Sequence, residues 1–233
     1  MKRGLLLVAL LTWLISGVAQ DLGKTEPANT LQELKEALRR ATNEMEYHPD
    51  SVELRLRKAA LNMQLEQWQV AKDEYDEVLR LQAGNLTALY FRAYANERLR
   101  RYSFARLDYE ELLRLVPGNF NAMLGLALLN QKDRHLTEAA DQLSLMVSMF
   151  PDSAVVYAAR ANLERERGQL DPADYDYSEA LRLEPENRDW LLAHFDVLLA
   201  LGRRNDARAK LDRLVALGVA RTALEEYYRK VRS

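Results

Sequence analysis

Residues 86–119 read LTALYFRAYANERLRRYSFARLDYEELLRLVPGN, and the pattern of this stretch recurs through most of the chain. Its Ala105 belongs to a ladder of alanines that are spaced 34 residues apart. The members of this ladder are Ala37, Ala71, Ala105, Ala139, Ala173 and Ala207. A second ladder with the same spacing consists of Ala59, Ala93, Ala127 and Ala161 and ends at Phe195. A repeat of this length indicates an array of similar supersecondary units that stack on one another.

Each unit of 34 residues is predicted to contain two helices. In its second half, apolar residues follow the spacing i, i+4, i+7 and i+8, as Ala105, Tyr109, Leu112 and Leu113 do. This spacing places one apolar stripe on a helix. A ladder of prolines then ends the helices, and an Asn or Ser two residues later is a good N-cap for the next helix. The prolines are Pro49, Pro117, Pro151 and Pro185.

The same phase divides the chain from residue 31 onward. Residues 31–51 are expected to form an N-terminal half repeat, residues 52–221 five full repeats, and residues 222–233 a C-terminal capping helix. The full repeats are 52–85, 86–119, 120–153, 154–187 and 188–221. The fifth repeat departs most from the pattern, as terminal units of a stack are expected to do.

These residues resemble the tetratricopeptide repeat. The matches in the second unit include Ala88-Leu89-Tyr90, Arg92-Ala93, Leu99, Arg101-Tyr102, Ala105, Tyr109, Leu113, Leu115 and Pro117-Gly118-Asn119. The fourth unit matches equally well through Val156-Tyr157, Arg160-Ala161, Gly168, Ala173, Tyr177, Ala180-Leu181, Leu183 and Pro185. The resemblance implies an all-α fold, a superhelical solenoid of antiparallel helix hairpins with about twelve helices. It also implies a concave groove that is lined by the first helix of each unit.

In this family the groove holds peptides or protein segments, so a non-catalytic protein-interaction module is the leading interpretation. By phase, the groove residues are Leu56, Met63, Tyr90, Tyr94, Glu97, Arg98, Asn121, Leu124, Leu128, Gln131, Lys132, Asn162 and Arg165. Tyr90 and Tyr94 lie one turn apart and are expected to form an anchor together with Leu124 and Leu128. The alternative is that some of these side chains only pack between neighbouring hairpins. Alternative functions are a structural component of a cell-envelope assembly and a homo-oligomer that forms through the irregular fifth repeat.

Residues 1–20 have the pattern of a secretory signal peptide. Lys2 and Arg3 precede an apolar run at residues 5–15, and small residues follow it. We expect cleavage after Ala19 or Gln20 and export to a periplasm or to the medium, with residues 21–30 as a flexible lead-in. An uncleaved membrane anchor is the rival interpretation, but the run is shorter than the ~20 residues that span a bilayer.

Composition argues against several other functions. The net charge of −2 gives no general attraction to nucleic acid or to anionic lipid. The chain has no cysteine and only three histidines, which are too scattered for a metal site with several histidine ligands. No phosphate-binding loop, dinucleotide fingerprint or catalytic serine motif is present. We therefore assign no catalytic residue, no cofactor and no metal, and expect protein or peptide partners.

One pairing follows from the register of the two helices. The seventh position of a repeat and the position sixteen residues later are Lys58/Glu74, Arg92/Asp108 and Arg160/Asp176. In the other two repeats these positions hold Leu126/Gln142 and His194/Lys210. We expect the three opposite-charge pairs to be ion pairs inside a hairpin rather than binding groups. Asp171 is expected to cap a helix, and Asp174 to lie at the surface, so neither belongs to a calcium loop.

Overall fold

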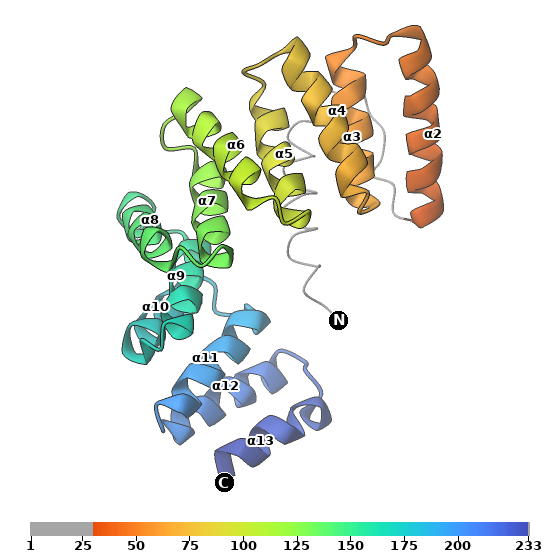
Figure 1. Ribbon diagram of the computed structural model, residues 1–233. Coiled ribbons are helices and arrows are strands. Elements are labelled where there is room, and N and C mark those ends of the chain that lie inside the picture. Colours follow the sequence, from red (N-terminus) through yellow and green to blue (C-terminus); the bar gives the residue numbers. More distant parts are fainter. Residues whose placement is uncertain (1–29, 233) are drawn as a thin grey trace. The chain divides into compact units, whose positions relative to one another are not determined.

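The computed structural model describes residues 30–232, which contain twelve α-helices, one short 3-10 helix and no β-strand (Figure 1). The predicted all-α fold is therefore confirmed. The predicted signal peptide and nearly all of the lead-in lie outside the described residues. The described residues divide into two compact units, one that ends at Pro117 and one that begins at Gly118. Among the residues that the structure describes, no helix combines the length and the apolar composition that a membrane crossing requires.

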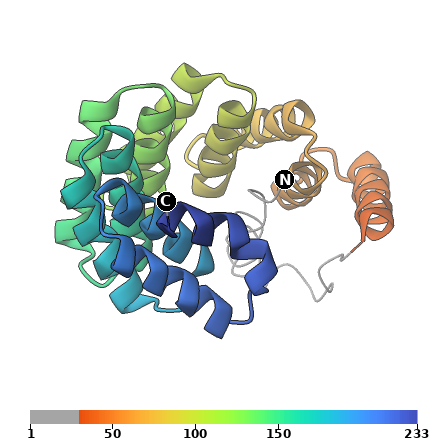
Figure 2. The same ribbon diagram turned by 90° about the horizontal axis from the view of Figure 1, so that it is seen from below.

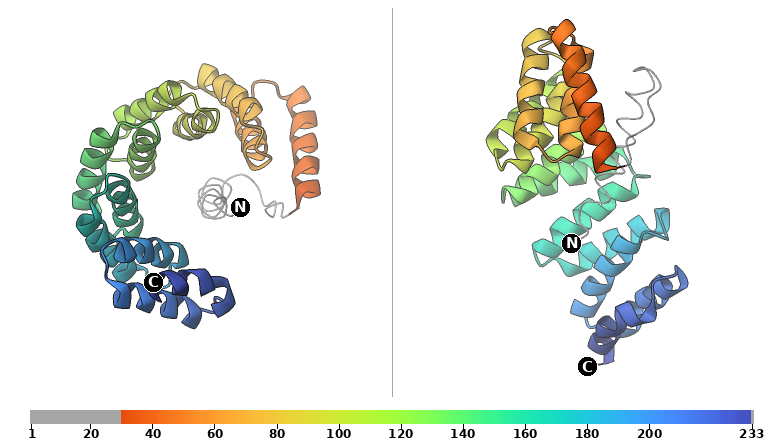
Figure 3. Two further views of the ribbon diagram at one scale, coloured as in Figure 1. Left: turned by 60° about the horizontal axis from the view of Figure 1, so that its bottom comes forward. Right: turned by 90° about the vertical axis from the view of Figure 1, so that its right-hand side faces the viewer.

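The first unit consists of five helices in which each packs on the next (Figure 3, orange to yellow-green). They are α2 (Leu31–Tyr47), α3 (Val52–Gln64), α4 (Trp68–Leu81), α5 (Leu86–Arg98) and α6 (Tyr102–Leu115). Tyr75, Val78 and Phe91 form a buried cluster with the small residues Ala59 and Ala71. Small side chains at the crossing positions let paired helices approach closely, which explains why alanine recurs there.

The second unit continues the pattern with seven α-helices (Figure 2, green to dark blue). They are α7 (Phe120–Lys132), α8 (Leu136–Met149), α9 (Ala154–Glu166), α10 (Leu170–Leu183), α11 (Arg188–Ala200), α12 (Arg204–Ala216) and α13 (Glu225–Arg232). The 3-10 helix η1 (Arg221–Leu224) leads into α13. Here α13 packs on α12, and Leu224 and Tyr228 are buried in the last core cluster.

The turn inside each repeat contains one residue with left-handed backbone geometry. Its φ is 57° at Glu66, 59° at Arg100, 67° at Arg134, 76° at Gly168 and 73° at Gly202. These five positions are again 34 residues apart. Glycine adopts this conformation without steric cost, whereas a residue with a Cβ atom is strained there. The packing of the two helices therefore determines this turn even where the local sequence does not favour it.

The predicted N-caps are confirmed at five helices, and at four of them the side chain makes the capping hydrogen bond. Ser51, Asn85, Asn119 and Asn187 each accept a hydrogen bond from the N–H three residues later, at 3.3, 2.9, 3.0 and 3.2 Å. At the start of α9, the Ser153 side chain makes no such bond. The N–H of Val156 donates instead to the Ser153 carbonyl oxygen at 3.1 Å, which removes the donor that the hydroxyl would have capped.

The prediction that Asp171 caps a helix is wrong. The helix α10 begins at Leu170 with Gln169 as its N-cap, so Asp171 lies inside the first turn. Because the left-handed Gly168 completes the turn, the chain enters the helix two residues earlier than predicted. Asp171 still carries a negative charge near the helix N-terminus, where such a charge is favourable.

Candidate interaction surfaces

The three predicted ion pairs are confirmed. Lys58 Nζ lies 2.6 Å from Glu74 Oε1. Arg92 donates to both carboxylate oxygens of Asp108, at 3.0 and 2.5 Å, and Arg160 does the same to Asp176, at 2.6 and 2.8 Å. The side chains of Asp108 and Asp176 are only 6% and 1% exposed. These pairs hold the two helices of a hairpin together, and the carboxylates of Asp108 and Asp176 are not accessible to a partner.

Arg92 also connects two neighbouring hairpins of the first unit. Its Nη1 donates to Asp76 of α4 at 2.8 Å, while its other nitrogens hold Asp108 of α6. Burial raises the pKa of the Asp108 carboxyl, and the guanidinium of Arg92 opposes that rise. The contact to Asp76 did not follow from the repeat register, because it joins side chains of different repeats.

In the fifth repeat, a histidine takes a partner from the preceding hairpin. His194 is buried, its Nε2 lies 2.6 Å from Asp174 Oδ1, and its ring stacks on Tyr177. The expectation of Asp174 at the surface is therefore wrong: its other oxygen pairs with Arg203, and its side chain is 19% exposed. Burial lowers the pKa of His194 although Asp174 raises it, so the neutral ring donates from Nε2.

The fourth repeat places two carboxyl groups beside one arginine. Glu164 occupies the position at which the first three repeats have asparagine, namely Asn62, Asn96 and Asn130. Its Oε1 is 3.9 Å from the Nε of Arg160, whose guanidinium is already held by Asp176. Glu164 Oε2 is buried without a hydrogen-bond partner. Burial first, and then the charge of Asp176, raises the pKa of Glu164 to about 7.

In the first unit, the face of the first helices is only partly open. Met63 and Tyr94 are 2% and 8% exposed and belong to the core, and Glu97 is 8% exposed. Tyr94 packs edge-on against Trp68, with 6.0 Å between the ring centroids. Arg98 is exposed, and its guanidinium lies 4.5 Å from the centre of the Trp68 ring and 3.4 Å from Tyr94 Oη. The alternative of packing between hairpins thus applies to Tyr94, and Arg98 is the accessible group.

Tyr90 and Leu56 lie at the margin of the same cluster. Both are half-buried and pack against the core of the first unit. The ring of Tyr90 contacts the rings of Phe91 and Tyr109 edge-on, with centroid distances of 5.2 and 5.9 Å. Burial raises the pKa of the Tyr90 phenol to about 12. This side chain therefore keeps its proton and offers only part of its ring to a partner.

In the second unit, the corresponding face is more polar. Asn162 accepts from Tyr177 Oη at 2.8 Å and from Arg165 at 3.4 Å, and Arg165 is exposed. Gln131 of α7 donates to Glu166 of α9 at 2.8 Å, so a hydrogen bond joins adjacent first helices. Leu128 and Lys132 are exposed, whereas Asn121 and Leu124 are half-buried.

The expected joint anchor is distributed over both units. Tyr90 and Tyr94 belong to the first unit, and Leu124 and Leu128 belong to the second. Their joint action on one ligand stays a prediction. Over residues 30–232, no group of three or more His, Asp or Glu side chains is placed to hold a metal ion.

A comparison with protein-family models gives no match, and a comparison with curated proteins gives none either. Solved structures give clear matches. A tetratricopeptide repeat protein from Parabacteroides merdae is 20% identical, with a TM-score of 0.68, over 99% of this chain and 86% of that chain. PilW, a widely conserved type IV pilus biogenesis factor, is 20% identical, with a TM-score of 0.70, over 79% of this chain and 86% of its own. YrrB, a tetratricopeptide repeat protein with an unusual peptide-binding site, is 19% identical, with a TM-score of 0.56, over 76% and 91%.

Proposed function

We propose that this chain, which has the fold of the tetratricopeptide-repeat proteins, is a protein-interaction module. It binds a peptide or an extended protein segment along the faces formed by the first helices of its repeats. The observation that carries this proposal is a pair of exposed arginines that neighbouring side chains hold in place. Arg98 lies over the Trp68 ring, and Arg165 donates to the Asn162 amide oxygen. The peptide-binding site of YrrB shows that a related fold serves this purpose in another protein.

Fixed arginines suit such a role for two reasons. A guanidinium that stacks on an aromatic ring keeps the N–H donors along its edge free for carbonyl or carboxylate oxygens. Because its position is already restricted, less conformational entropy is lost on binding. Aromatic and arginine side chains also contribute a large share of the energy at protein interfaces. We therefore expect Arg98 to be the first anchor for a ligand on the face of the first unit, and Arg165 for a ligand on the face of the second.

This proposal is tested with peptides selected from a random display library on the wild-type chain. We expect the variant Arg98→Glu/Arg165→Glu to bind the selected peptides at least ~10-fold more weakly, because both anchors are lost and their charge is reversed. Fluorescence anisotropy with labelled peptides measures the change. Truncation of Tyr94 would be a poor test, since that side chain belongs to the core.

A matched control reverses two charges outside the first helices. Arg80→Glu/Arg182→Glu changes one arginine in each unit, on second helices, and both side chains are 60% exposed. The proposal is wrong if this control loses as much affinity as the anchor variant. It also fails if no peptide is selected and the chain self-associates through Phe104 and Leu107, which are each 61% exposed on α6. That result would favour the alternative, a scaffold component of an envelope assembly.

We also propose that the chain is exported, with a signal peptide that is removed after Ala19 or Gln20. The support is the charged start, the apolar run and the small residues that follow it. The test is expression of the full chain in a Gram-negative host, followed by fractionation and intact-mass analysis. A periplasmic chain that begins at Gln20 or Asp21 is the expected result. A chain of full mass in the cytoplasm or in the membrane fraction would contradict it.

A further inference from the structure

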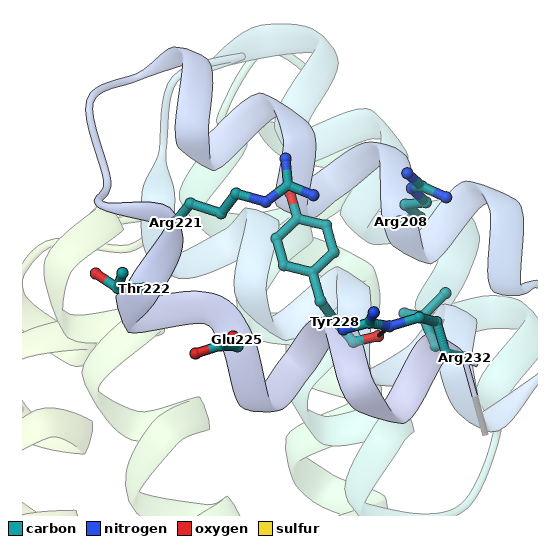
Figure 4. Close-up of a pocket in the computed structure, with 7 residues that line it drawn as sticks. Arg208, Arg221, Thr222, Glu225, Tyr228 and Arg232 are labelled. Carbon is teal, nitrogen blue, oxygen red and sulfur yellow. Dashed lines mark hydrogen bonds between the residues drawn. The ribbon is translucent and has the colours of Figure 1, made fainter.

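The end of the described chain forms a pocket that the repeat pattern does not predict. Its volume is about 350 Å³, and it lies between α12, η1 and α13 (Figure 4). Arg208, Arg221 and Arg232 line it from these three elements. The Tyr228 ring lies between them, and Glu225 is on the side away from Arg232. The pocket therefore combines three guanidinium groups, an aromatic wall and one carboxylate.

The contacts of these side chains leave donors available to a ligand. The Arg221 guanidinium lies 4.7 Å from the centre of the Tyr228 ring, so its N–H edge is not used by the stacking. Arg232 donates from Nε to the Tyr228 carbonyl oxygen at 3.3 Å, and its terminal nitrogens make no hydrogen bond within residues 30–232. Arg208 approaches Asp212 Oδ2 at a loose 3.9 Å, while Tyr228 Oη donates to the other oxygen of Asp212 at 2.6 Å.

The local charge favours an anionic ligand. Residues 203–232 contain nine Lys or Arg and four Asp or Glu, whereas residues 30–202 contain 21 Lys or Arg and 29 Asp or Glu. The mildly acidic net charge of the chain thus hides a basic C-terminal segment. Three guanidinium groups around a concave pocket raise the local concentration of carboxylates, and their planar forks match a carboxylate in two-point contacts.

We propose that this pocket binds a carboxylate-bearing peptide segment of a partner protein. The carboxylate is held by Arg208, Arg221 and Arg232, and Glu225 on the other side accepts from an N–H of the peptide. A volume of about 350 Å³ exceeds what a free phosphate needs and lies at the lower end of the range for ligand pockets. A membrane surface is a poorer fit, because Tyr228 and Val231 pack into the core and do not project.

The experiment uses a fluorescein-labelled oligoglutamate peptide and the full chain at about 0.15 M salt, where exposed charges are largely screened. We expect Arg221→Gln/Arg232→Gln to weaken binding at least ~10-fold, because two of the three cations are lost. Arg221→Lys keeps the charge but not the planar fork, and we expect a loss of ~3-fold or more. Circular dichroism checks that the variants keep the helical content of the wild type.

The matched control is Arg204→Gln/Arg229→Gln, which removes one exposed arginine from each of α12 and α13 outside the pocket. We expect its affinity to stay within ~2-fold of the wild type, since a screened surface charge contributes little. Equal losses in both double variants would overturn the pocket in favour of general charge attraction. So would a loss only in Arg98→Glu/Arg165→Glu, which would place the peptide on the first helices. Binding of inorganic phosphate, a single-stranded oligonucleotide or phosphatidylglycerol vesicles without binding of the peptide would also overturn it.

Discussion

We expect Arg160→Met to lower the free energy of unfolding by about 3–5 kcal/mol, the usual cost of removing one partner of a buried ion pair. The carboxylate of Asp176 is 1% exposed and accepts two hydrogen bonds from this arginine. Without the guanidinium, the Asp176 carboxylate loses both of these hydrogen bonds and still lies beside Glu164. Urea denaturation at neutral pH, followed by circular dichroism, measures the change.

Two further variants separate this loss from a general effect of removing arginine. Arg182→Met on α10 breaks an ion pair with Glu179 whose arginine is 60% exposed, and we expect a much smaller loss of stability than in Arg160→Met. Arg160→Met/Asp176→Leu removes both charges of the buried pair, and we expect it to recover much of the loss. Similar stabilities of Arg160→Met and Arg182→Met would show that the buried pair does not stabilise the fourth repeat.

Much of the fold follows from the sequence, because a solenoid repeats its own packing rules. The alanine and proline ladders predict where helices cross and end, and the register of each hairpin predicts the pairs of Arg92 with Asp108 and Arg160 with Asp176. These contacts lie within one repeat, at a fixed separation of sixteen residues. Periodicity specifies such contacts directly, since both partners move with the same phase.

Contacts between successive repeats did not follow from the phase. His194 lies next to Asp174 of the preceding hairpin, and Arg92 also holds Asp76 of the helix before it. Each depends on how two hairpins stack, and a pattern within one repeat does not encode that geometry. The same limit applies to Tyr94, which has the phase of a groove residue and is buried against Trp68 of the neighbouring hairpin.

The candidate interaction surfaces also follow only partly from the sequence. The phase places Arg98 and Arg165 on first helices, but only the structure shows that neighbouring side chains fix them. The C-terminal pocket lies beyond the last full repeat, where α13 packs on α12. Its three arginines are separated by 11 to 13 residues and do not follow the 34-residue spacing. A signal for it was present in the sequence, namely the excess of nine basic over four acidic residues in 203–232.

Glu164 is the basis of a prediction about how stability depends on pH. Asparagine precedes it at the same position in three repeats, and Asn96 donates to Asp108 at 3.5 Å. A glutamate at this position can donate a hydrogen bond to the neighbouring aspartate, as Asn96 does, only when its carboxyl group carries a proton. Since burial and Asp176 raise its pKa from 4.5 to about 7, the folded state keeps a proton that the unfolded state loses between these values.

The sign of the effect follows from this difference in bound protons. The stabilisation is fully present below pH 4.5 and is lost as the pH rises through about 7. The full rise in pKa corresponds to roughly 3 kcal/mol, and the residual exposure of the side chain reduces this to about 2–3 kcal/mol. Glu164→Gln keeps a neutral donor at every pH. We therefore expect the free energy of unfolding of this variant, relative to the wild type, to rise by about 2–3 kcal/mol between about pH 5 and pH 8.

Subtraction of the two stability curves isolates Glu164 from the other titrating groups. His194 acts in the opposite direction, because its lowered pKa reduces stability as the pH falls, but it is present in both proteins. A difference between Glu164→Gln and the wild type that stays constant over this range would show that Glu164 ionises normally. In that case, Arg160 would hold two carboxylates at neutral pH, and Glu164→Gln would gain no stability relative to the wild type at high pH.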